Sequence, residues 1–133
     1  MFMKQNKKGD WYFQELSTDP KDARLDFMNS GLCPLTFGHD GPKIGTVIKD
    51  SAFVNNGAGY AEIRFSNDSF AEKVLRLVIA GSAKAVSIGV KAVDWINVPG
   101  KNGRLPKVFY TTWEPYEISI VKKGSDCGAR ILI

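Results

Sequence analysis

Short apolar runs separated by turn residues predict that the chain is built mostly of β-strands. Apolar or alternating stretches that fit strands occur at 11–13, 32–37, 43–48, 52–54, 59–65, 85–93, 107–112, 116–121 and 129–133. Asn55-Asn56-Gly57 predicts a tight hairpin turn between two of these stretches. Clusters of Gly, Pro and Asn predict surface loops at 38–42 and 97–107.

One segment has helical periodicity. Its apolar stripe consists of Ala71, Val74, Leu75, Val78 and Ile79. Ser69 and Glu72 fit a capping box at the start of this helix, and Gly81 fits a C-terminal cap. Strands dominate, so the pattern predicts a mostly β (α+β) fold: a small antiparallel β-barrel with one or more packed helices.

Length and composition indicate one ordinary globular domain. The chain has 133 residues, of which 44% are hydrophobic and 24% charged. We expect residues 1–10, which are polar and lysine-rich, to be a flexible segment, and residues 11–133 to form the domain. No apolar run reaches the roughly 18 residues of a membrane span, and no secretory signal precedes the domain, so we expect a cytoplasmic protein.

Charge and cysteine usage narrow the choice of partners. The net charge is +4, but Lys and Arg are scattered, so we expect no specific nucleic-acid partner. The charge also leaves open a third function, that of a small β-barrel that binds acidic partners.

Cys33 and Cys127 are far apart and are accompanied by a single histidine, which predicts two reduced thiols, no metal site and no cofactor.

Three side chains could carry chemistry, although each also has an ordinary structural explanation. Ser87 lies at the centre of an apolar strand and needs a hydrogen-bond partner. That partner could be a backbone carbonyl or a catalytic base. His39, in a glycine-flanked loop, is the one imidazole available as that base. Glu117 lies on an alternating strand and could orient the imidazole, with Asp40 as a rival for that role.

Three segments together resemble the prohead (capsid-maturation) serine proteases of tailed phages. PLTFGHDGPKIGTV resembles the block around the catalytic histidine of that family, and VLRLVIAGSAKAVSIGVKA resembles the block around its serine. WEPYEISIVKKGSDCGARI resembles the third block, a strand followed by a turn. The three blocks follow the family's order over residues 32–133. Gly38 departs from the pattern, because the family usually has Asn or another side chain there.

The resemblance implies a serine endopeptidase with a fold similar to herpesvirus assembly proteases. Carried over, Ser87 is the nucleophile, His39 its base and Glu117 the third member. The implied substrates are the scaffold protein or the major capsid protein precursor, with the portal as a further partner, inside the assembling prohead in the host cytoplasm. The alternative is a catalytically inactive structural or assembly protein of the capsid with the same fold.

The mechanism that follows leaves several points open. Backbone N–H groups beside Ser87, or Lys122 or Lys123, are candidate oxyanion donors. We expect substrates to be extended peptides that bind by strand addition, with the 97–107 loop at the rim of the site. The cleavage motif and the formation of a homo-oligomer are not determined by the sequence.

Overall fold

The structure is a computed structural model that describes residues 2–121 and residue 131. Its strands are β1 (Phe2–Gln5), β2 (Trp11–Leu16), β3 (Pro34–Phe37), β4 (Lys43–Val47), β5 (Phe53–Asn55), β6 (Ala58–Tyr60), β7 (Ile63–Phe65), β8 (Ala85–Val98) and β9 (Lys107–Val121). An α-helix, α1 (Ser69–Ile79), and a 3-10 helix, η1 (Pro20–Asp22), complete the described elements. No helix in this part of the chain is long and apolar enough to cross a membrane.

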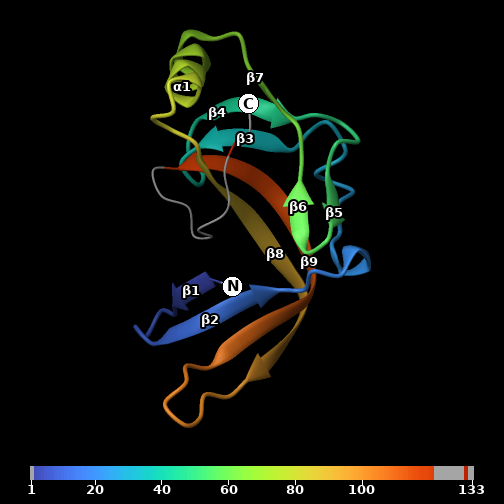
Figure 1. The fold of residues 1–133 in the computed structure, drawn as a ribbon, viewed down its shortest axis with the longest axis vertical. Coiled ribbons are helices and arrows are strands. Elements are labelled where there is room, and N and C mark those ends of the chain that lie inside the picture. Colours follow the sequence, from blue (N-terminus) through green and yellow to red (C-terminus); the bar gives the residue numbers. More distant parts are fainter. Residues whose placement is uncertain (1, 122–130, 132–133) are drawn as a thin grey trace.

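The main sheet is built around β9. β8 runs antiparallel along almost all of β9, from the Val98–Lys107 pair to the Ala85–Val121 pair. On the other edge, β2 pairs with residues 107–110 of β9 and β3 pairs with residues 118–120, both in parallel. β1 extends the sheet beyond β2, and β4 and then β7 extend it beyond β3. The long β8–β9 pair thus joins two groups of strands (Figure 1).

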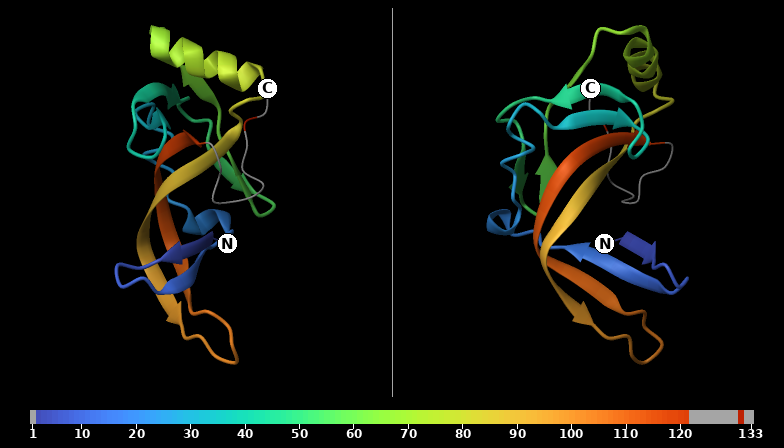
Figure 2. Two further views of the ribbon diagram at one scale, coloured as in Figure 1. Left: turned by 90° about the vertical axis from the view of Figure 1, so that its left-hand side faces the viewer. Right: turned by 180° about the vertical axis from the view of Figure 1, so that it is seen from behind.

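The prediction of an antiparallel barrel is wrong for the described part of the chain. The sheet has seven strands, is mixed, and is open, because β1, β7 and β8 each pair on one edge only. Figure 2 shows the sheet bending along β8 and β9 without closing. The coarser prediction, mostly β with a packed helix, is confirmed. Parallel neighbours need long connections, and a pattern of short alternating runs does not reveal them.

β8 and β9 are longer than the sequence pattern predicts. The expected strands 107–112 and 116–121 form one strand through Pro115, which has no N–H to donate. Pro115 lies between the residues of β9 that pair with β2 and those that pair with β3. On its other side, the register of β8 shifts between Gly89 and Val90. The hydrogen-bonded ladder between β8 and β9 is therefore irregular at Pro115, which has no N–H to donate to it.

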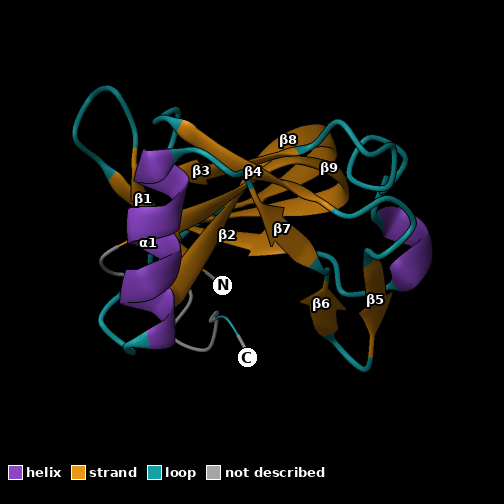
Figure 3. Cartoon of the chain, turned by 90° about the horizontal axis from the view of Figure 1, so that it is seen from above, coloured by secondary structure: helices purple, strands orange, loops and turns teal. Residues whose placement is uncertain are grey.

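The largest buried cluster lies between the sheet and α1. Leu35 of β3 and Ile120 of β9 are fully buried and pack with Ile44 of β4 and with Val74 and Val78 of α1. The helix packs against β4 and β7, on the opposite side of the molecule from the β5–β6 hairpin (Figure 3). This packing fixes the end of the sheet where β3, β8 and β9 meet.

The ends of α1 differ slightly from the predicted capping box. The Asp68 carboxylate accepts a 2.9 Å hydrogen bond from the Ala71 N–H, so Asp68 is the N-cap and Ser69 is the first helical residue. Both Asp and Ser are good N-cap residues, and the pattern of apolar residues does not show which of the two neighbours is the cap. Gly81 follows the helix with a φ of +80°, the left-handed conformation expected of a C-terminal glycine.

Three other predicted segments differ from the structure or lie mostly outside the described residues. Residues 2–5, expected within a flexible segment, form β1 and pair with β2. The stretch 59–65 is split between β6, which pairs with β5 around the Asn56-Gly57 turn, and β7, which belongs to the main sheet. The strand expected at 129–133 lies mostly outside the described residues; within it, the Ile131 N–H donates to the Lys84 carbonyl over 2.9 Å.

Two leucines three residues apart test the position of the core. Leu35 is fully buried, whereas Leu32 is 72% exposed. We expect Leu35→Ala to lower the free energy of unfolding by about 2–5 kcal/mol in urea titrations, because it leaves a cavity. Leu32→Ala should change it by less than about 0.5 kcal/mol. Equal effects of the two substitutions would contradict this assignment of the core.

Candidate active site

The register of the sheet explains why an apolar strand carries a serine at its centre. Ser87 of β8 is paired with Ser119 of β9, and Gly89 is paired with Glu117. Directly paired residues lie on the same face of a sheet, so Ser87 and Glu117 share a face. The neighbouring Val86 points to the other face and packs against the core cluster. Ser87 therefore lies on the face of β8 that carries the polar groups, and the opposite face is partly buried against the core at Val86.

His39 is held above this face by a tight loop between β3 and β4. The Phe37 N–H donates to the Pro42 carbonyl over 3.0 Å, and the Gly38 N–H donates to the Ile120 carbonyl over 2.9 Å. Gly38 and Asp40 have φ values of +78° and +55°. This left-handed conformation favours Gly and Asn, which accounts for Gly38 at this position.

Close approach within the same loop explains a second glycine. A Cβ atom added to Gly41 would lie 2.0 Å from the Phe37 carbonyl oxygen, a distance that no side chain tolerates. The loop is thus compact enough that the backbone on both sides of His39 is fixed by hydrogen bonds and by steric contact.

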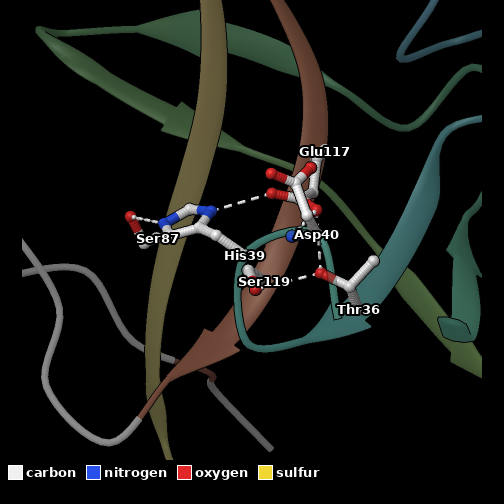
Figure 4. A network of polar contacts seen from close by, with 6 residues as sticks. All are labelled: Thr36, His39, Asp40, Ser87, Glu117 and Ser119. Atoms are coloured by element: carbon white, nitrogen blue, oxygen red, sulfur yellow. Dashed lines mark hydrogen bonds and ion pairs between the residues drawn. The ribbon is translucent and has the colours of Figure 1, made fainter. Parts of the chain in front are cut away.

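The three side chains expected at the site form one chain of hydrogen bonds (Figure 4). His39 Nε2 lies 2.9 Å from Ser87 Oγ, and His39 Nδ1 lies 2.8 Å from Glu117 Oε1. The carboxylate can only accept, so Nδ1 carries the proton and Nε2 presents its lone pair to the serine hydroxyl. This is the geometry required of a nucleophile, a base and a residue that orients the base.

Further hydrogen bonds fix the other oxygen of Glu117. The Asp40 N–H donates to Oε2 over 3.1 Å, and the Thr36 hydroxyl lies 3.1 Å from the same oxygen. Thr36 Oγ1 also lies 2.9 Å from Ser119 Oγ. A hydroxyl has one proton, so Thr36 donates it to the carboxylate and accepts a hydrogen bond from Ser119. The roles of Thr36 and Ser119 were not predicted, because they depend on the parallel pairing of β3 with β9.

Burial and hydrogen bonding act in opposite directions on Glu117. Its side chain is 5% exposed, and this burial alone would raise its pKa. Hydrogen bonds from His39, the Asp40 N–H and Thr36, together with the charge of His39, outweigh burial and hold the Glu117 pKa below its ordinary value. The carboxylate is therefore ionised at neutral pH and able to stabilise an imidazolium.

The choice between Glu117 and Asp40 as the partner of His39 is decided by contact. Glu117 Oε1 reaches Nδ1, whereas Asp40 contributes its backbone N–H to Glu117 and is an exposed residue. Asp40 thus supports the carboxylate that contacts the imidazole.

Cys33 is a buried free thiol with low reactivity. Burial, with a further contribution from the negative charge of Glu117, raises its pKa to about 11, so it is a protonated thiol at neutral pH. Cys127 and the candidate oxyanion donors Lys122 and Lys123 lie outside the described residues. Among the residues that are described, no three His, Cys, Asp or Glu side chains are arranged to hold a metal ion.

A cleft of about 210 Å³ opens beside Ser87. Its lining consists of Lys4, Gln14, His39, Ser87, Ile88, Gly89, Val90 and Tyr116. Four consecutive residues of β8, 87–90, line this cleft together with Tyr116 of the paired strand β9. In the described part of the chain, β9 is the one strand that pairs with β8, so the other edge of β8 is unpaired.

Comparison with known proteins relates the chain to phage capsids. It is 30% identical over 122 residues to the major capsid protein of Halomonas phage phiHAP-1, a match that covers 87% of this chain and 20% of the capsid protein. The chain thus spans about a fifth of the length of the curated relative that it matches. No family model matches the chain, and no solved structure matches it. The finding supports a capsid-related protein and does not by itself indicate proteolysis.

The lowered pKa of Glu117 predicts a pH-dependent contribution to stability. Its folded-state pKa lies below the ordinary value of 4.5, so the stabilisation is fully present above that pH and is lost as pH falls through the folded-state pKa. We expect Glu117→Gln to cost about 1–3 kcal/mol at neutral pH in urea titrations, and the difference from wild type to shrink in acid. Glu62→Gln, at an exposed position, should cost less than about 0.5 kcal/mol. A pH-independent cost of Glu117→Gln would contradict the assignment.

The conformation of Gly38 gives a second prediction. A Cβ atom there would meet nothing within 4 Å, so a substitution is penalised only by the positive φ. Gly38→Val should lower the free energy of unfolding by about 1–3 kcal/mol, whereas Gly38→Asn should cost less because asparagine tolerates this conformation. Urea titration of both variants measures the difference, and equal stabilities would show that the loop has another conformation.

Proposed function

We propose that the protein is a serine endopeptidase of phage capsid maturation. The observation that carries this proposal is the chain of hydrogen bonds from Ser87 Oγ through His39 to the ionised Glu117, at 2.9 and 2.8 Å. A lone serine hydroxyl is a weak nucleophile, and an adjacent oriented base is what activates it. The three residues come from β8, the β3–β4 loop and β9, and they meet beside an open cleft.

The geometry supports an acyl-transfer mechanism. His39 Nε2 takes the proton of Ser87 as Oγ forms a bond to the carbonyl carbon of the scissile peptide. Glu117 stabilises the resulting imidazolium, which then protonates the leaving amine as the C–N bond breaks. A water molecule, deprotonated by His39, hydrolyses the acyl-enzyme and releases Ser87. Backbone N–H groups beside Ser87 remain the candidate donors to the tetrahedral oxyanion within the described chain.

The cleft favours an extended peptide as substrate. Residues 87–90 of β8 line it, and the edge of β8 that does not pair with β9 is unpaired in the part of the chain that is described. A peptide that adds to such an edge forms main-chain hydrogen bonds and presents its carbonyl groups beside the strand. Ser87 lies on that strand, so strand addition brings a peptide bond to the nucleophile.

The similarity to a capsid protein supports the choice of substrate. We infer that the chain acts on the major capsid protein precursor or on the scaffold protein, with the portal as a further partner, inside the assembling prohead in the host cytoplasm. The motif resemblance to prohead proteases and the similarity to a phage major capsid protein agree on this setting. Confinement within a shell would also supply a high local concentration of substrate.

A second candidate function is favoured by the same comparison. The matched relative is itself a structural protein of the capsid, so the chain could serve in assembly without catalysis. On this alternative, the hydrogen bonds among Ser87, His39 and Glu117 hold β8, β9 and the β3–β4 loop together and react with nothing.

A fluorophosphonate probe separates the two functions without knowledge of the cleavage motif. In an active site, Ser87 Oγ bonds to phosphorus, the P–F bond breaks, fluoride leaves and His39 accepts the proton. We expect wild type to be labelled at Ser87, and Ser87→Ala to lose labelling and to cleave the co-expressed capsid precursor about 10⁴-fold more slowly or worse. Mass spectrometry locates the label, and gel electrophoresis follows cleavage.

Ser82→Ala is the matched control, because Ser82 is exposed and precedes β8 by three residues. It should be labelled and should cleave like wild type. If wild type is neither labelled nor able to cleave the precursor, while Ser87→Ala and wild type bind the precursor equally, the enzymatic proposal fails and the assembly function stands.

A further inference from the structure

Gln14 of β2 is a buried polar residue in the same cleft. It is 7% exposed, and its side-chain amide makes no hydrogen bond to any residue that the structure describes. No described side-chain N or O atom is both sealed from solvent and unpaired. The amide atoms of Gln14 must therefore keep some contact with solvent. Gln14 lines the cleft beside Ser87, and the cleft is the open space into which the amide can reach.

Gln14 lies across the cleft from β8, the strand that carries Ser87. β2 pairs with the first part of β9, whereas Ser87 pairs with the last part, yet both residues line one cleft because the sheet bends along β8 and β9. Figure 2 shows β1 and β2 approaching the middle of β8 from across the bend. A peptide that occupies the cleft along residues 87–90 thus lies between the edge of β8 and Gln14.

We infer that Gln14 is a substrate-binding residue whose side-chain amide hydrogen-bonds to a main-chain peptide group of the bound substrate; this inference rests on the proposed function. A primary amide has two donors and an acceptor, which complement the C=O and N–H of a peptide group. The Gln14 amide gives up no hydrogen bond to a described residue when it turns to the substrate, so it is available to bind a peptide group in place of solvent in the cleft. Main-chain groups are the natural partners, because a strand added to β8 presents them across the cleft.

If Gln14 binds the substrate peptide, removing its amide should weaken peptide binding without slowing the chemical step. Gln14→Met keeps the length of the side chain and removes its hydrogen bonds. We expect KM for a fluorogenic peptide to rise about tenfold with kcat within about twofold, because the interaction is equal in the ground and transition states. The peptide is the one that wild type cleaves best from a set tiled through the capsid precursor. The melting temperature should not fall, because the substitution removes no hydrogen bond to a described residue.

Gln5→Met is the matched control, since Gln5 lies in the same hairpin and its amide donates to the Gly9 carbonyl away from the cleft. It should leave KM unchanged. An unchanged KM in Gln14→Met overturns the inference. A fall in kcat at constant KM, or a fall in melting temperature, also overturns it, because Gln14 would then act in the transition state or hold the fold.

A binding measurement keeps this inference separate from the proposed function. The same labelled peptides are titrated by fluorescence anisotropy into Ser87→Ala and into the Ser87→Ala, Gln14→Met double variant. If wild type cleaves nothing but the double variant binds peptide about tenfold more weakly than Ser87→Ala, the enzymatic proposal fails and the binding role of Gln14 stands. If peptide binds neither variant and wild type cleaves nothing, both are overturned.

Discussion

The candidate site depends on the ionised carboxylate of Glu117. It is almost fully buried, and its charge is compensated by hydrogen bonds from three groups, His39, Thr36 and the Asp40 N–H. These donors belong to β3 and to the loop that follows it, so one carboxylate on β9 fixes the loop that carries the histidine. Through the histidine, the same carboxylate determines which nitrogen faces Ser87. Removing the charge would release the loop and the tautomer together.

The sheet provides the conditions for this interaction. β9 lies between β8 and β3, and the register of both pairings places Ser87, Thr36 and Glu117 on one face. The opposite face of the same strands is the buried core against α1. The alternation of side chains along a strand thus separates a polar site from an apolar core by one residue. A register slip of one residue in β8 would turn Ser87 toward the core and Val86 toward the polar face.

The local features of this site could be predicted from the sequence, and the long-range ones could not. The loop at 38–42, the helix and the strand positions follow from glycine, proline and apolar patterns, and the three candidate residues follow from chemistry and from motif resemblance. The parallel pairing of β3 with β9 joins segments some eighty positions apart, and no local pattern encodes it. Thr36 and Ser119 were missed for that reason, and so was Gln14, whose place in the cleft depends on the bend of the sheet. The predicted barrel was wrong because strand content does not determine closure.

His39 is the one histidine in the chain, so its imidazole can be observed alone. Nitrogen-15 NMR of histidine-labelled protein, recorded at alkaline pH, reports the tautomer of this imidazole without overlap. We predict a single Nδ1–H tautomer in wild type that is lost in Glu117→Gln. An Nε2–H tautomer, or an averaged mixture that Glu117→Gln does not change, would contradict it.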